Sequence, residues 1–159
     1  MACGGDDSAN PRTPNSAQAP SSQGARYLAE ADRICAENAS PREQAVEDPA
    51  ESGEAARAQI SARSTLDTKL RALTPPAELA GEVAAFHERT ARIIALLREE
   101  IVLAESPGRF DDERIERFNG IATRVSRALI EREQLAADIG FSVCGAPEAG
   151  PALSSPAGG

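Results

Sequence analysis

Apolar side chains recur at helical spacing through the middle of this chain, and this periodicity constrains the fold more than any other feature. The clearest stripe runs through residues 76–105 and contains Leu79, Val83, Phe86, Ile94, Leu97 and Ile101. Side chains at these separations lie on one face of an α-helix. We therefore expect a helix over this range, about 40 Å long, with one face turned to a core.

Two segments before this one show the same pattern. The first, residues 25–38, would bury Tyr27, Ala31 and Ile34, with Leu28 and Cys35 at the edge of that face. The second opens at Asp48-Pro49, which fits a helix N-cap followed by proline, and ends near Leu73. Its inward positions are predicted to be Ile60, Leu66, Leu70 and Leu73. Ser40-Pro41 fits a cap as well, but Pro49 limits it to a short turn.

A fourth helix is predicted from Asp111, its N-cap, to about Ile139, where Gly140 ends it. Its inward face would carry Phe118, Ala122, Val125, Leu129 and Ala136. Acidic residues at 111–113 favour the positive end of this helix.

Short connections indicate how these helices are arranged. "LTPPAEL" at 73–79 ends the second helix, because Pro75 and Pro76 cannot continue it, and Thr74 can cap the third. A loop this short makes its two helices antiparallel neighbours. The predicted fold class is all-α: an antiparallel up-down-up-down bundle of three long helices and a short N-terminal one.

The two ends of the chain differ in composition from the helical section. Residues 4–26 and 146–159 consist mostly of Gly, Ser, Pro, Ala, Asn and Gln, which cannot bury enough surface to offset the entropy of ordering. We expect a flexible tether over 1–26, a bundle domain over 27–145 and a disordered tail over 146–159. Fraying or an expression remnant is the alternative for both ends.

Charge and motifs exclude several function classes. The net charge is −8, and no basic stripe stands apart from neighbouring acids, so we expect no nucleic-acid partner. The longest apolar run, residues 93–97, is too short to cross a bilayer. Nucleophile, phosphate-loop, zinc and haem motifs are missing from the sequence. We therefore predict no catalytic residue, no metal site, no cofactor and no enzymatic activity.

Two polar features receive structural interpretations. His87, the only histidine, lies beside the apolar stripe of its helix and is predicted to be a half-buried boundary residue. Arg63, Asp67 and Arg71 are spaced i, i+4 and are predicted to form ion pairs on the helix surface.

The start of the chain, "MACGGDD", is similar to the end of a bacterial lipobox followed by a mature lipoprotein N-terminus. That resemblance implies that Cys3 is the lipid-modified residue and that residues after it form a tether to the membrane. Only Met1 and Ala2 precede Cys3, so we expect the natural signal segment to be missing from the sequence as written, either trimmed or lying upstream of the given start.

The segments "DRICAEN", "LRALTPPAEL" and "DIGFSVCG" resemble small helical lipoproteins of high-GC actinobacteria, over about residues 27–145. This resemblance implies a helical fold at the outer face of the cell membrane. The family has no settled activity, so the resemblance implies none for this chain.

Export makes a disulfide between Cys35 and Cys144 possible, because thiols can remain oxidised outside the cytoplasm. In an up-down bundle the first helix begins where the fourth ends. After Gly140 the chain can turn back to Cys35, with Phe141 and Val143 covering the core edge. We predict this disulfide; two buried free thiols are the alternative.

Three functions remain open. The first is a membrane-tethered, extracytoplasmic binding or scaffold module whose ligand is unknown. The second is a structural spacer of the envelope, and the third is an enzyme or carrier with an unrecognised site. A polar-lined cavity holding arginine, Tyr27 or His87 would favour ligand binding, and a solid interior would favour the spacer.

Overall fold

A computed structural model of the chain describes residues 21–38, 49–108 and 111–144, and for residues 49–52 the backbone alone. The described residues form four helices: α1 (Ser22–Glu37), α2 (Pro49–Arg71), α3 (Ala80–Glu105) and α4 (Asp112–Ile139). This part of the chain contains no strand. The predicted all-α bundle with a short first helix is confirmed.

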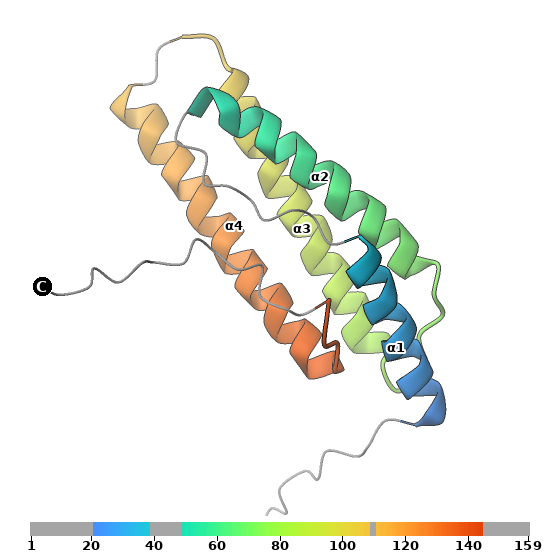
Figure 1. Ribbon diagram of the computed structural model, residues 1–159. Coiled ribbons are helices and arrows are strands. Elements are labelled where there is room, and N and C mark those ends of the chain that lie inside the picture. The colour runs from blue at the N-terminus through green and yellow to red at the C-terminus, as the bar shows by residue number, and fades with distance from the viewer. Residues whose placement is uncertain (1–20, 39–48, 109–110, 145–159) are drawn as a thin grey trace, which may run out of the picture.

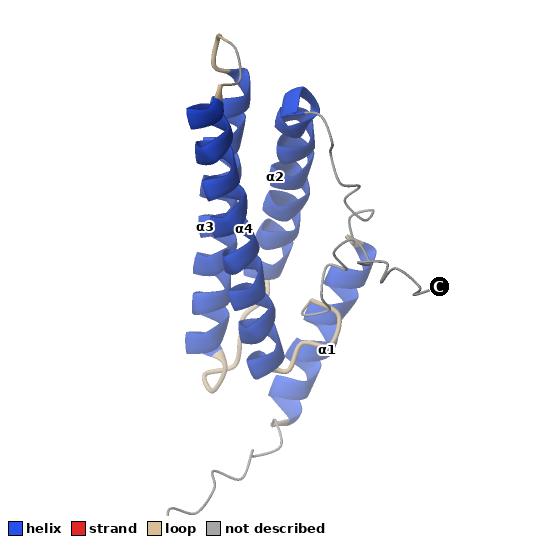
Figure 2. Cartoon of the chain, turned by 90° about the vertical axis from the view of Figure 1, so that its left-hand side faces the viewer, coloured by secondary structure: helices blue, strands red, loops and turns tan. Residues whose placement is uncertain are grey.

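The helices run up, down, up and down in chain order (Figure 1). α3 packs against both α2 and α4, whereas no described Cα atom of α2 lies within 8 Å of one in α4. α1 packs against α2 beside the end of the bundle where α2 ends and α3 begins (Figure 2). α1 has 16 residues and α4 has 28, so α1 can cover only part of the bundle's length.

The first helix begins earlier than predicted. The Ser21 side chain caps α1 by accepting a hydrogen bond from the Gly24 amide at 3.0 Å. Residues 22–26, predicted as part of the tether, therefore belong to the bundle. The rest of the predicted tether, the turn opened by Ser40, the Asp48 cap and the tail over 146–159 lie outside the described residues.

The third helix begins later than predicted, at Ala80. The Leu79 amide donates to the Pro76 carbonyl at 3.0 Å, which closes a single turn before the helix. Thr74 therefore does not cap α3. The N-cap residue of α3 is Leu79, which makes no side-chain hydrogen bond to the helix. The predicted Asp111 cap and the Gly140 end are confirmed, and Gly140 adopts the left-handed φ of 95° that favours glycine.

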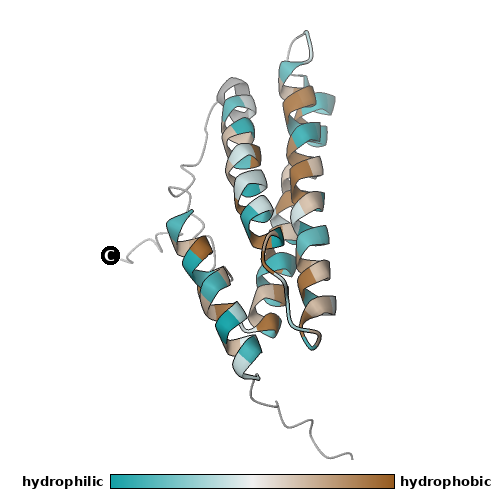
Figure 3. Ribbon diagram, turned by 90° about the vertical axis from the view of Figure 1, so that its right-hand side faces the viewer, coloured by the Kyte–Doolittle hydropathy of each residue, from teal (hydrophilic) through white to brown (hydrophobic). Residues whose placement is uncertain are grey.

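The buried apolar residues form two clusters. The disulfide core, at the α1 end, consists of Tyr27, Ala31, Ile34, Cys35, Leu70, Val83, Phe86, Ala136, Ile139, Phe141 and Cys144. The aliphatic core, at the other end, consists of Ala56, Ile93, Leu96, Leu97, Leu103, Ile121, Val125 and Ala128. Each helix also carries hydrophilic residues on its surface (Figure 3).

Two predicted inward positions are wrong. Ala122 is exposed, because the buried face of α4 is centred on Ile121, Val125 and Ala128, with Phe118 and Leu129 at its edge. Val143 is 40% exposed: after Gly140 the chain buries Phe141 and then Cys144.

Candidate functional site

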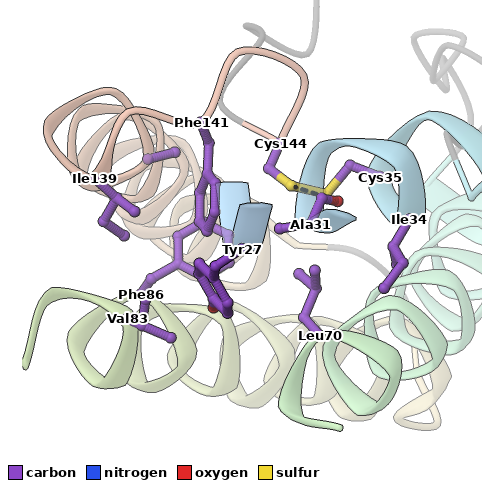
Figure 4. Packing of buried hydrophobic residues seen from close by; sticks show 11 residues of the cluster. Tyr27, Ala31, Ile34, Cys35, Leu70, Val83, Phe86, Ile139, Phe141 and Cys144 are labelled. Carbon is purple, nitrogen blue, oxygen red and sulfur yellow. Dashed lines mark hydrogen bonds between the residues drawn. A yellow bond between two sulfur atoms is a disulfide. The ribbon is translucent and has the colours of Figure 1, made fainter. Parts of the chain in front are cut away.

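The structure brings Cys35 and Cys144 together in a disulfide with a Cα–Cα distance of 5.2 Å. Both cysteines are buried, and the bond links α1 to the chain that follows α4 (Figure 4). Phe141 turns inward beside them, with its ring centroid 6.3 Å from that of Tyr27 and 5.5 Å from that of Phe86. Cys3, the predicted lipid site, lies outside the described residues.

The Asp32 carboxylate on α1 reinforces this link. Its oxygens accept hydrogen bonds from the amides of Ser142 (2.9 Å), Val143 (2.8 Å) and Cys144 (3.1 Å), and from the Ser142 hydroxyl (2.5 Å). Burial acts to raise the pKa of Asp32, but these hydrogen bonds outweigh it and lower the pKa below its ordinary value. Asp32 is therefore held ionised as an anchor for the chain after α4.

A layer of buried polar side chains lies between the two cores. Arg63 from α2, Thr90 from α3 and Arg132 from α4 are 8%, 3% and 6% exposed. Arg132 donates from Nε to the Thr90 hydroxyl at 3.1 Å, and its guanidinium carbon lies 4.4 Å from the centroid of the Phe86 ring. The cavity among these side chains measures about 10 Å³, so it can hold one water molecule at most.

Asp67 joins this layer to the surface. It lines the internal cavity, and its carboxylate contacts two residues on the outer side: Oδ1 lies 2.6 Å from His87 Nδ1, and Oδ2 accepts from Arg71 Nε at 2.7 Å. Because Nδ1 of His87 faces a carboxylate, it carries the proton, and Nε2 is the nitrogen left for another partner. One carboxylate thus orients an imidazole from α3 and a guanidinium from α2.

These contacts correct two predictions. His87 is 6% exposed, so it is a buried residue with a partner and not a half-buried boundary residue. The Asp67–Arg71 pair forms as predicted, but Arg63 is buried and the Asp67 side chain is only 15% exposed. The Arg63–Asp67–Arg71 series therefore runs from the interior to the surface and is not a surface feature.

A surface depression of about 260 Å³ lies beside His87, between the end of α2 and the start of α3. We call it the Arg71 pocket; it is lined by Arg71, Leu73, Pro75, Ala80, Val83, Ala84 and His87. The walls are mostly apolar, and Arg71 is the one lining residue with a permanent charge. A concave apolar surface with a few oriented polar groups is typical of small-ligand sites.

At the opposite end of the bundle, Arg114 has a structural role. Its guanidinium donates to the carbonyls of Leu103 (2.5 Å), Ala104 (3.2 Å), Ser106 (2.7 Å) and Gly108 (3.1 Å). These carbonyls lie at and after the C-terminal end of α3, where no further helical turn can bond them. A buried cation therefore closes this helix end and fixes the α3–α4 connection.

Other site types find no support in the described residues. No group of three His, Cys, Asp or Glu side chains there could hold a metal ion. No helix in this part of the chain combines the length and apolarity that crossing a membrane requires.

The buried arginines were not predicted, although their spacing in the sequence gives a signal. Arg132 lies seven residues after Val125 and four before Ala136, and Arg114 lies seven before Ile121. Arg63 lies seven residues from both Ala56 and Leu70. An arginine at the spacing of core residues, as at Arg63 and Arg132, therefore indicates a buried polar layer.

No protein-family model, curated protein or solved structure matches this chain. The resemblance to actinobacterial lipoproteins therefore stays a hypothesis based on the segments quoted above.

Proposed function

We propose that this chain is a lipid-anchored, extracytoplasmic helical module that binds a small ligand in the Arg71 pocket. The observation that carries the location is the buried Cys35–Cys144 disulfide. Structural disulfides are rare in the reducing cytoplasm and persist in exported proteins. The bond joins residues separated by 109 positions, so it forms when α1 and the chain after α4 are brought together.

The sequence supplies the support for the anchor. Cys3 is followed by two glycines and two acids, and residues 4–20 contain no large apolar side chain. A lipidated cysteine needs a polar spacer of this kind to hold a folded domain clear of the bilayer. More than one acyl chain on Cys3 would anchor the domain stably, whereas a single chain would not.

The pocket favours binding over the second candidate, an envelope spacer. A spacer needs only a stable domain, and the cavity of about 10 Å³ in the polar layer agrees with that role. A spacer does not require an imidazole and a guanidinium that one carboxylate orients beside an open depression. The arrangement of Asp67, Arg71 and His87 is the feature that a spacer leaves unexplained.

Anchoring is tested by expressing the chain behind a bacterial lipoprotein signal segment and separating membranes from soluble protein. We expect the protein in the membrane fraction, an acylated Cys3 by mass spectrometry, and a shift to the soluble fraction on Cys3→Ser. The Cys35→Ala/Cys144→Ala variant is the matched control, which should still partition into membranes. An unmodified mature Cys3 would contradict the anchor.

The location is tested by titrating thiols in denatured, non-reduced protein recovered from the oxidising compartment. We expect no reactive thiol from Cys35 or Cys144. Reactivity of both would contradict export-linked oxidation even if the anchor were found.

A further inference from the structure

We infer that the Arg71 pocket binds small amphipathic anions: an oxyanion, carboxylate or phosphate, that meets the Arg71 guanidinium, and a short aliphatic part that lies on the apolar walls. This inference rests on the proposed binding function and adds the chemical class of the ligand.

Arg71 supplies the anion contact. Its Nε is engaged by Asp67, which fixes the plane of the guanidinium, and the side chain is otherwise 51% exposed. Its two terminal nitrogens make no hydrogen bond or ion pair with the described residues. An exposed guanidinium whose terminal N–H groups are not engaged by the protein can bind an oxyanion through two parallel hydrogen bonds.

The environment of Arg71 favours an anion over a cation. Asp67, beside the pocket, shares its charge between Arg71 and His87, and none of the described residues that line the pocket is acidic. Ala80, the first residue of α3, also lines the pocket, and the positive end of that helix dipole adds to the field of Arg71. The nearest acid on the first turn of α3, Glu82, is exposed and is not part of the lining.

The walls and the volume of the Arg71 pocket determine the size and the apolar character of the uncharged part of the ligand. Leu73, Pro75, Val83 and Ala84 offer aliphatic surface beside Arg71, and His87 is the other polar residue of the lining. A volume of about 260 Å³ is below the range of roughly 300–1,000 Å³ common for drug-sized ligands. A short alkyl chain with one charged end matches this space, with a dissociation constant on the order of 1 mM for so small a ligand.

The test is a titration of the chain of residues 1–159, without lipid, followed by amide chemical shifts. Four probes separate the requirements: hexanoate, hexyl phosphate, 1-hexanol and acetate. We expect hexanoate or hexyl phosphate to shift amides around Arg71 and His87, and to bind at least tenfold more tightly than 1-hexanol or acetate. The tighter of the two anions identifies the carboxylate or the phosphate as the natural head group.

Two pairs of variants assign the binding to this pocket. Arg71→Gln should weaken the tighter anion at least tenfold, whereas Arg92→Gln, which changes an exposed arginine on α3, should not. Ala84→Leu should fill the pocket and abolish binding, whereas Ala91→Leu, also exposed on α3, should leave it unchanged. Arg71 and Ala84 are both exposed, so we expect neither substitution to unfold the bundle, and an unchanged unfolding transition in each variant checks this.

The outcomes separate this inference from the proposed function. Equal binding of hexanoate and 1-hexanol, lost on Ala84→Leu, would leave a binding module and overturn the anionic class. Binding of an anion that neither Arg71→Gln nor Ala84→Leu weakens would overturn this site. Failure of all four probes to bind would overturn the inference. Failure of anchoring affects none of these measurements, because the titrated chain carries no lipid.

Discussion

The two cores of the bundle differ in the elements and links that bury their apolar side chains. The aliphatic core needs only three long helices, and its buried members are Ala, Val, Ile and Leu. The disulfide core adds α1 and the chain after α4, three aromatic rings, a covalent bond and the Asp32 hydrogen bonds. The long helices close the aliphatic core by packing their apolar faces, whereas the shorter α1, of 16 residues, is also joined to the bundle by these further links.

The polar layer separates these two regions. Arg63, Thr90 and Arg132 replace one level of apolar packing, and the functional candidates Asp67, Arg71 and His87 lie on its outer side. Buried polar groups of this kind specify which residues lie opposite one another, since a shifted helix would leave them without hydrogen bonds. Asp67 thus links the polar layer to the Arg71 pocket, which lies at the disulfide-core end of the bundle beside Val83.

Removing the disulfide should have the largest effect and should act mainly on one region. The bond joins residues separated by 109 positions, for which the chain-entropy account gives about 4–5 kcal/mol of unfolding free energy. We expect Cys35→Ala/Cys144→Ala to lose about that amount in chemical denaturation. Hydrogen exchange should show loss of protection in α1, with amides around Ile93 and Leu97 remaining the most protected. Unchanged protection of α1 would contradict the difference between the two cores.

Truncating one central side chain in each core tests whether both cores contribute to the free energy of unfolding. Phe86 and Leu97 are each 1% exposed. We expect Phe86→Ala to cost about 3–5 kcal/mol and Leu97→Ala about 2–5 kcal/mol. Val102→Ala, at a position 69% exposed on the same helix, should change the free energy of unfolding by no more than about 0.5 kcal/mol. Equal losses at all three positions would mean that the assigned face of α3 is wrong.

Arg114 tests the end of the aliphatic core. Arg114→Ala leaves the carbonyls of Leu103 and Ser106 without their donor, at an expected cost of about 1–3 kcal/mol. Arg114→Lys should restore little, because an ammonium cannot reach the same set of carbonyls in one plane. Arg117→Ala, an exposed arginine one turn further along α4, is the control. A thermal unfolding series that ranks Arg114→Ala with Arg117→Ala would contradict the capping role.

The sequence allowed most of the fold to be predicted because its signals are local. Apolar spacing, the Asp111 cap and Gly140 are each read within one segment, and they predicted α4 to within a residue at both ends. The disulfide was predicted on other grounds: the export implied by the start of the chain, and the helix order that brings the chain after α4 back to α1. The predicted start of α3 was too early. Pro75 and Pro76 can begin either a helix or a separate turn, and in the structure residues 76–79 form a turn that precedes the helix.

The candidate site was harder to predict, because it depends on contacts between helices. Asp67 can pair with Arg63 or Arg71 along α2, and its contact with His87 exists only once α3 is placed beside it. Ala122 was assigned to the core from its spacing to Phe118, but the buried face of this part of α4 is centred on Ile121, Val125 and Ala128. Alanine carries little information about burial, since it is tolerated on either face of a helix.

Acid should weaken the disulfide core slightly more than the aliphatic core, through Asp32. The pKa of Asp32 is lowered in the folded protein, so its contribution is present above the unfolded value of about 3.9 and is lost as pH falls through the folded value. We expect the effect to be about 1 kcal/mol or less, because the carboxylate remains partly open to water, which screens it.

Asp32→Asn should lower stability at pH 7 by this amount and reduce the loss of stability below pH ~4. Glu88→Gln, at an exposed acid on α3, is the control. Amide exchange at Ser142 and Val143 should rise in Asp32→Asn and stay unchanged in Glu88→Gln, whereas equal exchange in both variants would show that the disulfide alone holds the chain after α4.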